Sequence, residues 1–352
     1  MTTVVSDISI NQSSNDKLSI QTGPDTWYNN YPIFSSGKRQ SPIDIGTEYV
    51  DYDSSLSPIK INYKPEKHLH IVNTGLSVRA DIKETSEISG GPLEGKYRLE
   101  QFHFHWGSNS NKGSEHTLNG YTYASELHLV HWNKGKYSSF AEAADKSDGL
   151  AVLGFFIKEG HEHKELRKLT DGIQRIFDKD ALTKIPDKFD PKHILPSDLS
   201  NYWTYDGSLT TPPFYESVQW IVFADMIEMS PEQLNLLRCM RSCSCEGKYI
   251  IDNYRCPLPL GERKLRSSFR MLGGVLIDLL REAESITYTL VSRHQYSSPR
   301  LKISYTSHLG TELNVHVLIL EKCLGDTIRT MVHAPGVTSF QLPMERDNRQ
   351  ST

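Results

Sequence analysis

Long hydrophobic runs are scarce in this sequence of 352 residues. The most apolar stretches are residues 150–157, 273–280 and 315–321, whereas a helix needs about 20 apolar residues to cross a bilayer. Residues 1–20 also lack the basic start and the apolar core of a secretory signal. We therefore predict a soluble protein with a cytoplasmic location and no membrane span.

An excess of positive charge is also absent. The chain has 39 lysines and arginines against 43 aspartates and glutamates, and its formal net charge is −4. Proteins that bind nucleic acid usually present a strongly basic face. The charge balance therefore argues against a nucleic acid partner.

Cysteine is sparse, and the odd number of five does not suit a disulfide framework. Four of the five, Cys239, Cys243, Cys245 and Cys256, lie close together in the sequence. Their spacing does not match a zinc finger or a zinc ribbon. A second metal site is one interpretation of this cluster, and free thiols in a surface loop are the interpretation that we favour.

Histidine, by contrast, occurs in a suggestive pattern. His103 and His105 are two residues apart in QFHFHWG, and residues at i and i+2 of a strand share one face. A catalytic zinc usually keeps three protein ligands, and the stretch ELHLVHWN offers His128 and His131 on opposite faces. The pattern favours His128, because His131 shares its face with leucines. The chain has 14 histidines, so on spacing alone a packing role for the pair stays open.

Short strands dominate residues 40–260, where aromatic and β-branched stretches alternate with turn residues. Helices are predicted at 139–148 and 230–240, the second with Ser230 and Gln233 forming a capping box. This pattern predicts a large mixed β-sheet with peripheral helices.

The region after residue 269 has a different character. Apolar residues recur at helical spacing and then alternate as in strands. The helical set is Leu272, Val275, Leu276 and Leu279, and the alternating sets are Ile286, Tyr288, Leu290; Leu301, Ile303, Tyr305; and Leu313, Val315, Val317, Ile319. The pattern predicts a helix followed by strands. The strands could add to a sheet edge or dock a partner, and an extension without a role is an equally open interpretation.

Seven stretches together resemble the α-class carbonic anhydrases in their order and separations: QSPIDI, QFHFHWG, GSEHTLNG, ELHLVHWN, LAVLGFF, YDGSLTTPPFYESVQW and IIDNYR. The resemblance covers residues 23–269. It implies an α+β, mainly β fold with a large twisted mixed sheet, short peripheral helices and zinc at the base of a conical cavity. Residues 1–22 are then predicted to be a flexible arm, and residues 270–352 an extension of unknown function.

The resemblance implies a zinc enzyme that interconverts CO2 and water with bicarbonate and a proton through a zinc-bound hydroxide. It assigns the Zn2+ ligands to His103, His105 and His128. Carbonic anhydrase is the standard example of such a site, in which the cation lowers the pKa of bound water to about 7. The implied small-molecule partners are CO2 and bicarbonate, with sulfonamide-type and anion inhibitors.

Further roles follow from the resemblance, residue by residue. Gln101, Glu126 and the backbone carbonyl of Asn253 are expected to accept hydrogen bonds from the ligand imidazoles. Thr210 and the buried carboxylate Glu115 are expected to orient the hydroxide.

The resemblance also implies which residues line the walls of the cavity. The apolar, substrate-binding wall of the cavity is expected from Val130, Val152, Leu209, Val218 and Trp220, and the polar wall from Thr211 and Gln101. The Ser41–Pro42 and Pro212–Pro213 bonds are expected to be cis.

The sequence departs from the family at the proton shuttle. The matching motif NTGLSV places Leu76 there, and an alkyl side chain cannot carry a proton. We therefore expect slow proton transfer, with His70 and Lys67 as possible substitutes. The competing interpretation is a related interaction module with little or no catalysis, and the retained histidines argue against it.

Overall fold

The computed structural model describes residues 30–243 and 248–270 and five later strand segments, whose bounds are given below. The predicted arm at 1–22, the predicted helix at 272–279 and Cys245 lie outside the described residues. The chain divides into two compact units, Met1–Phe269 and Arg270–Thr352.

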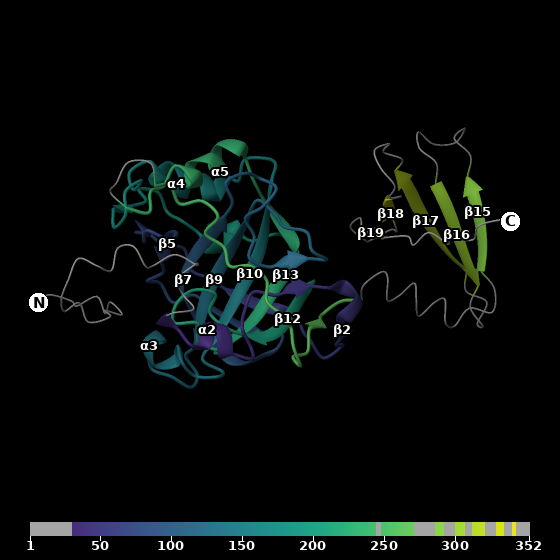
Figure 1. The fold of residues 1–352 in the computed structure, drawn as a ribbon, viewed down its shortest axis with the longest axis horizontal. Coiled ribbons are helices and arrows are strands. Elements are labelled where there is room, and N and C mark those ends of the chain that lie inside the picture. The colour runs from purple at the N-terminus through teal and green to yellow at the C-terminus, as the bar shows by residue number, and fades with distance from the viewer. Residues whose placement is uncertain are drawn as a thin grey trace, which may run out of the picture. The chain divides into compact units, whose positions relative to one another are not determined.

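In the described part of the first unit, twelve strands form one twisted sheet (Figure 1). Ten of them follow one path: β11 (Leu182–Lys184), β4 (His70–Asn73), β5 (Val78–Asp81), β7 (Leu93–Trp106), β9 (Ser125–Asn133), β10 (Leu150–Glu159), β13 (Val218–Met229), β12 (Tyr202–Gly207), β14 (Arg266–Ser267) and β2 (Asp51–Tyr52). The strands β3 (Ile59–Asn62) and β6 (Glu87–Gly90) pair with each other, and β6 also pairs with β7.

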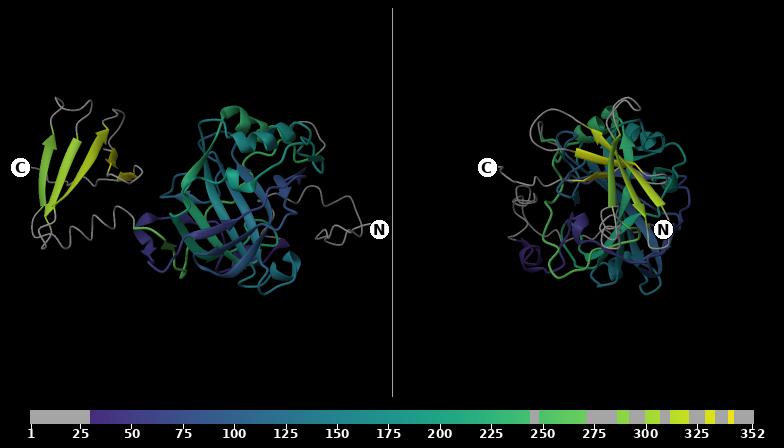
Figure 2. Two further views of the ribbon diagram at one scale, coloured as in Figure 1. Left: turned by 180° about the vertical axis from the view of Figure 1, so that it is seen from behind. Right: turned by 90° about the vertical axis from the view of Figure 1, so that its right-hand side faces the viewer.

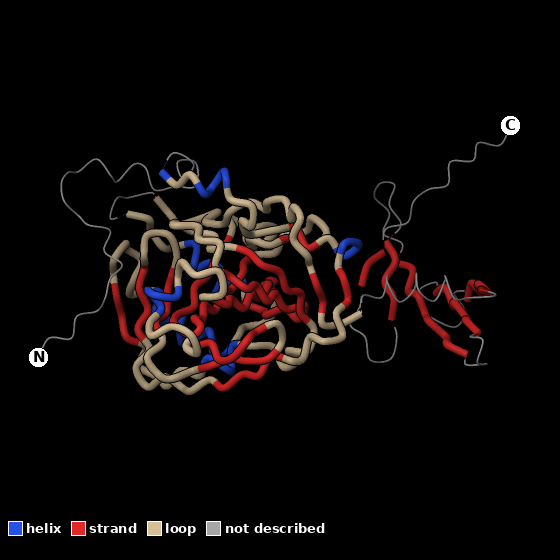
Figure 3. Tube along the Cα trace, turned by 90° about the horizontal axis from the view of Figure 1, so that it is seen from below, coloured by secondary structure: helices blue, strands red, loops and turns tan. Residues whose placement is uncertain are grey.

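Both strand directions occur in this sheet. Most neighbours are antiparallel, but β10 pairs with β13, and β14 with β2, in parallel. A separate parallel pair joins β1 (Asp44–Ile45) to β8 (Thr117–Leu118). Figure 2 shows the sheet from behind, and Figure 3 shows the strands in the middle of this unit with loops around them. The predicted α+β, mainly β fold with a large mixed sheet is confirmed.

The central strands β9 and β10 are buried along most of their length. Every residue of β9 is buried, as are the first eight of β10. Strands in such positions read as continuous apolar runs, and the sequence 150–157 is such a run. By contrast, β7 alternates between buried and partly exposed residues over its inner half. One face of β7 is therefore left for polar side chains.

Helices are few and short in the described residues. They are α2 (Ile33–Ser36), α3 (Phe140–Ala143), α4 (Lys164–Ile173) and α5 (Pro231–Arg238), with 3-10 turns η3 (Thr47–Tyr49) and η4 (Pro191–Ile194). The predicted capping box of α5 is confirmed. Figure 1 shows α4 and α5 side by side at one end of the sheet. None of the helices in the described residues is long and apolar enough to cross a membrane.

Two helices differ from the sequence prediction. Helix α3 ends at Ala143, well before residue 148, because a turn brings Gly149 against the Ala143 carbonyl, where a Cβ atom would lie only 1.7 Å from that oxygen. Helix α4 was not predicted, although Leu166, Leu169 and Ile173 recur at helical spacing and are buried.

Two further sequence predictions concern the backbone and the core. The Ser41–Pro42 and Pro212–Pro213 bonds are cis, as expected. His131 is fully buried and lies 2.8 Å from the Tyr63 hydroxyl oxygen through Nε2, so its predicted place in the core is confirmed. Burial lowers the pKa of His131 to about 3.

The second unit contains a five-stranded antiparallel sheet in the described residues: β15 (Ile286–Val291), β16 (Arg300–Thr306), β17 (Glu312–Leu320), β18 (Arg329–His333) and β19 (Phe340–Leu342). The first three strands fall where the alternation predicted them. The register aligns Leu290 with Leu301, Leu301 with Val317 and Val317 with Val332.

We expect His131 to make stability depend on pH. In the unfolded chain its pKa is about 6.5, and in the fold it is about 3. Between these values the unfolded state binds one more proton, so stability is lost as pH falls, by about 1.4 kcal/mol per pH unit. Urea unfolding of the metal-free protein at pH 7, 6 and 5 should show a shallower loss for His131→Gln than for the wild type. Parallel pH profiles of the two proteins would contradict this expectation.

Candidate metal centre

Three imidazoles meet on one face of two neighbouring strands. His103 and His105 lie two residues apart on β7, and His103 is the direct antiparallel partner of His128 on β9. Their ring centroids are 5.1 Å apart for His103 and His105, 5.3 Å for His103 and His128, and 4.7 Å for His105 and His128. One nitrogen from each ring lies within 4.8 Å of those of the others, a separation that lets one ion contact all three.

The other nitrogen of each ring is already bound. His103 Nδ1 lies 2.9 Å from Gln101 Oε1, His105 Nδ1 lies 2.9 Å from the Asn253 carbonyl oxygen, and His128 Nε2 lies 2.7 Å from Glu126 Oε1. Carbonyl and carboxylate oxygens only accept hydrogen bonds, so each imidazole donates its N–H. The tautomers are thereby fixed, and the lone pairs are left on His103 Nε2, His105 Nε2 and His128 Nδ1.

The three free nitrogens fit a zinc ion. His105 Nε2 is buried without a hydrogen-bond partner among the described residues, and such a buried orphan atom is costly unless something binds it. Burial, together with the charges of the neighbouring histidines, lowers the pKa of His103 and of His105. Both rings are therefore neutral near pH 7, which is the form that binds a metal.

A buried network holds Glu126 in place, and sequence reasoning missed most of it. Glu126 Oε1 also lies 2.7 Å from His116 Nδ1, and its Oε2 accepts the backbone N–H groups of Glu115 and His116. His116 Nε2 lies 2.7 Å from the oxygen of the Tyr205 hydroxyl group, and this O–H group donates to Ser41 Oγ. Both ring nitrogens of His116 are thus engaged, so this histidine offers no atom to a metal.

The charge state of Glu126 follows from the same network. Burial alone would raise the pKa of this carboxyl, but the Coulombic interactions and hydrogen bonds with His116 and His128 hold it well below its usual range. Across the sheet, Gly154 is the direct partner of His128, and a Cβ atom there would lie 3.3 Å from Glu126 Oε1. A glycine leaves room for the carboxylate.

Glu115 and Thr210 are both buried, but no hydrogen bond connects their side chains among the described residues. Glu115 Oε1 accepts the Arg255 backbone N–H at 2.8 Å and lies 3.3 Å from His105 Nδ1. Glu115 Oε2 lies 3.9 Å from His128 Nδ1 and has no hydrogen-bond partner in the described residues. A carboxylate oxygen beside the three histidines is therefore free to accept a hydrogen bond.

The expected apolar residues line up across the sheet. Val130 is the direct partner of Val152, and Val152 that of Trp220, in the same row as Gln101. Val130, Val152, Val218 and Trp220 are buried, and the Trp220 ring centroid lies 4.8 Å from that of His128. Leu209 and Thr211, on the loop that leads from β12 to β13, are half-buried.

Leu76 is connected to the histidines through one residue. Its side chain is 40% exposed, so it faces solvent rather than the core. Its carbonyl oxygen accepts a hydrogen bond from Asn253 Nδ2 at 2.8 Å, and the Asn253 carbonyl oxygen accepts the one from His105. Asn253 thus connects the loop that carries Leu76 to the histidine cluster.

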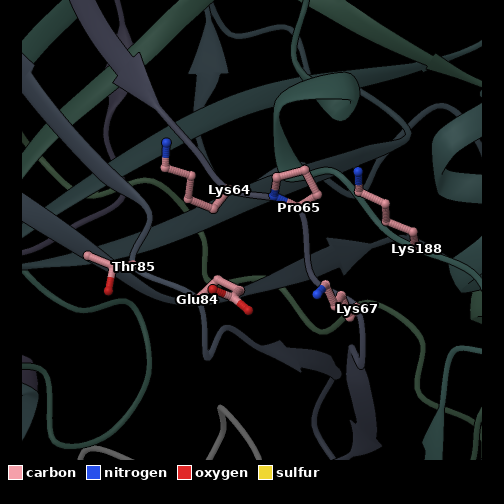
Figure 4. Close-up of a pocket in the computed structure, with 6 residues that line it drawn as sticks. All are labelled: Lys64, Pro65, Lys67, Glu84, Thr85 and Lys188. Atoms are coloured by element: carbon pink, nitrogen blue, oxygen red, sulfur yellow. The ribbon is translucent and has the colours of Figure 1, made fainter.

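The two substitutes considered for Leu76 lie elsewhere. Lys67 lines a surface cavity of about 470 Å3 together with Lys64, Pro65, Glu84, Thr85 and Lys188, none of which belongs to the histidine cluster (Figure 4). His70 on β4 is the direct partner of Asp81 on β5, and Asp81 that of Gln101 on β7. His70 therefore stands two strands away from His103.

The sequence of the first unit is similar to a known family. A model of eukaryotic-type carbonic anhydrase matches residues 22–269. The chain belongs to this family. Carbonic anhydrase 1 of Mus musculus is 48% identical over 255 residues, which cover 71% of this chain and 96% of that protein. Carbonic anhydrase 7 is 45% identical over 253 residues in both Mus musculus and Homo sapiens, covering 70% of this chain and 95% of each relative.

Membership in the carbonic anhydrase family confirms the resemblance read from the motifs and the prediction of a carbonic anhydrase enzyme. Carbonic anhydrases are zinc-dependent, and the histidine cluster offers a group that suits this metal. The matched residues end at 269, where the first compact unit also ends.

We expect His105→Ala to abolish stoichiometric zinc binding by this carbonic anhydrase, because two imidazoles cannot complete a three-nitrogen site. His131→Gln is the matched control, since it removes a buried histidine that lies outside the cluster and should leave one zinc per chain. Metal analysis after dialysis against a competing chelator measures both. Equal zinc retention by wild type and His105→Ala would contradict the assignment.

Gln101→Ala should weaken zinc affinity by about 10- to 100-fold without abolishing it, because the imidazole of His103 loses its orienting acceptor. Chelator competition at several chelator concentrations gives the dissociation constant. An unchanged constant would show that Gln101 does not orient the ring.

Proposed function

We propose that this chain catalyses the reversible hydration of CO2 to bicarbonate and a proton, with Zn2+ held by His103 Nε2, His105 Nε2 and His128 Nδ1. The observation that carries the proposal is the matched set of hydrogen bonds that leaves one lone pair on each ring. When bound, zinc supplies a Lewis acid that lowers the pKa of a bound water to about 7.

The acceptors behind the rings keep the imidazoles fixed. Gln101, Glu126 and the Asn253 carbonyl each hold one N–H, so the rings do not need to reorient during turnover. Glu126 remains an acceptor throughout, since its pKa is held far below neutral.

Thr210 and Glu115 are assigned to orientation of the reacting water. An ionised carboxylate can only accept, so a hydrogen bond from Thr210 Oγ1 to Glu115 Oε2 leaves a threonine lone pair for the water. The free Oε2 of Glu115 supports this role. The hydrogen bond itself is absent among the described contacts, so we place its formation in the occupied site.

The apolar wall suits a substrate without hydrogen-bonding hydrogens. Val130, Val152, Val218, Leu209 and Trp220 can exclude water around CO2, while Thr211 and Gln101 stand on the polar side. Anions and sulfonamide-type compounds are the inhibitors expected at such a site.

Proton release is the step in which this chain is expected to differ from family members that carry a proton shuttle at the position of Leu76. Each hydration event produces one proton, and Leu76 has no group that can accept it. Turnover at high substrate should therefore depend on buffer, whereas hydration at low substrate should not.

We assign catalysis to residues 23–269 and propose a cytoplasmic location for the enzyme. No catalytic role is assigned to residues 270–352 or to the cysteines near Cys243. The competing function, an interaction module of the same fold without catalysis, is weakened by the presence of all three imidazoles.

The deciding experiment is stopped-flow CO2 hydration by full-length protein of known zinc content, at low and high buffer concentration, beside Leu76→His. We expect wild-type kcat to rise with buffer and kcat/KM to stay constant. The variant should be roughly tenfold faster in dilute buffer, because a positioned imidazole transfers protons near neutral pH.

No hydration above background by protein that carries one zinc per chain would overturn the catalytic proposal and favour the interaction module. Hydration that does not depend on buffer would keep catalysis but show that another group already exports the proton.

A further inference from the structure

A β-bulge lies beside the histidine cluster. Along β7, Leu99 pairs with His131 on β9 and Gln101 pairs with Val130, so Glu100 is an extra residue without a partner on β9. A bulge of this kind can redirect a side chain. The Glu100 carbonyl oxygen accepts the Ile82 backbone N–H at 2.9 Å, which anchors the bulge to the residue that directly follows β5.

The bulge places Glu100 on the same face of the sheet as the histidine cluster. Glu100 Oε2 accepts a hydrogen bond from Trp132 Nε1 at 3.0 Å. Trp132, Val130 and His128 alternate along β9 and therefore share one face. Along the strand, Glu100 lies about 10 Å from His103, a span that two or three water molecules can bridge.

The second carboxylate oxygen is available. Glu100 Oε1 makes no hydrogen bond with any residue in the described part of the chain, and the residue is half-buried rather than enclosed. One oxygen is thus fixed by Trp132, while the other can exchange protons with water.

Charged neighbours surround Glu100 on its own strand and on β5. Arg79 is the direct partner of His103, and its Nε donates to Asp81 Oδ1 at 2.8 Å, so these two charges largely compensate each other. Burial raises the pKa of Glu100, and the charge of Asp81 raises it further. The Trp132 hydrogen bond and the charges of Arg98 and Arg79 lower it, but the pKa stays above its usual value. A carboxyl shifted toward neutral pH both accepts and returns protons more readily.

We propose that Glu100 is a slow proton relay of this enzyme, which takes over part of the role that Leu76 cannot perform and leaves wild-type kcat dependent on buffer. This inference rests on the proposed CO2 hydration.

The relay step balances. A proton from the hydration reaction passes along water molecules to Glu100 Oε1, where a new O–H bond forms and the carboxylate becomes neutral. A buffer base then removes that proton, the O–H bond breaks, and the carboxylate is restored. Trp132 Nε1 stays bound to Oε2 and keeps the group in place in both states.

Glu100 is better placed than His70. His70 lies on β4, and β5 separates it from β7, which carries His103. Arg79 and Asp81 of β5 therefore lie between His70 and the histidine cluster. A proton would have to cross this ion pair to reach His70, whereas Glu100 shares a strand with two of the three histidines.

The kinetic test uses zinc-loaded full-length protein and compares Glu100→Gln with two controls. Glu94→Gln removes a carboxylate that is 88% exposed on the same strand, and His70→Gln removes the competing group. In dilute buffer, Glu100→Gln should lower kcat by roughly tenfold, less than the ~100-fold typical of a positioned acid–base group because buffer takes over part of the transfer. Its kcat/KM should be unchanged, and concentrated imidazole buffer should restore kcat.

A second test does not depend on activity. The indole 1H–15N resonance of Trp132 should titrate with Glu100, at a midpoint above the usual glutamate value of about 4.3, and Glu100→Gln should remove this titration. The glutamine can still accept the indole N–H, so the resonance should otherwise be retained.

The outcomes separate the two proposals. The relay would be overturned if both controls lost kcat and Glu100→Gln did not, or if all four proteins had equal kcat. It would also be overturned if the Trp132 resonance did not titrate. Absence of hydration in wild-type protein that carries zinc would instead overturn the proposed function, and the Trp132 titration would still report whether Glu100 exchanges protons at this position.

Discussion

The pairing register of β7 with β9 is the constraint on which the site depends. It sets His103 opposite His128 and leaves His105 two residues further on the same face. A slip of one residue would turn His128 to the opposite face of the sheet and leave two imidazoles instead of three. The same register brings Val130 beside Gln101 and, through the bulge at Glu100, decides which polar groups share a face with the histidines.

Buried hydrogen bonds make this arrangement stiff. Glu126 receives four of them from two histidines and two backbone N–H groups, and Asn253 binds His105, Trp106 and Leu76 at once. A buried polar group that lost one partner would be left unsatisfied at a cost of about 1–3 kcal/mol. The network therefore favours one orientation of each imidazole and links the loop of Leu76 to the cluster.

Much of the fold could be read from the sequence, because period-two alternation and the capping box of α5 are local signals. The choice of His128 over His131 also followed from strand alternation, and the structure places His131 in the core beside Tyr63. The bulge at Glu100 and the contacts of His116 with Tyr205 could not be predicted. They depend on how distant strands pair, since 89 residues separate His116 from Tyr205.

X-ray absorption at the zinc edge of the purified full-length protein reports the atoms around the metal. If His103, His105 and His128 hold the zinc, we expect three imidazole nitrogens at about 2.0–2.1 Å and one further light atom. We expect no sulfur, since the three histidines are assembled without any contribution from Cys239 or Cys243. A zinc–sulfur distance of about 2.3 Å, or fewer than three imidazoles, would rule out this set of ligands.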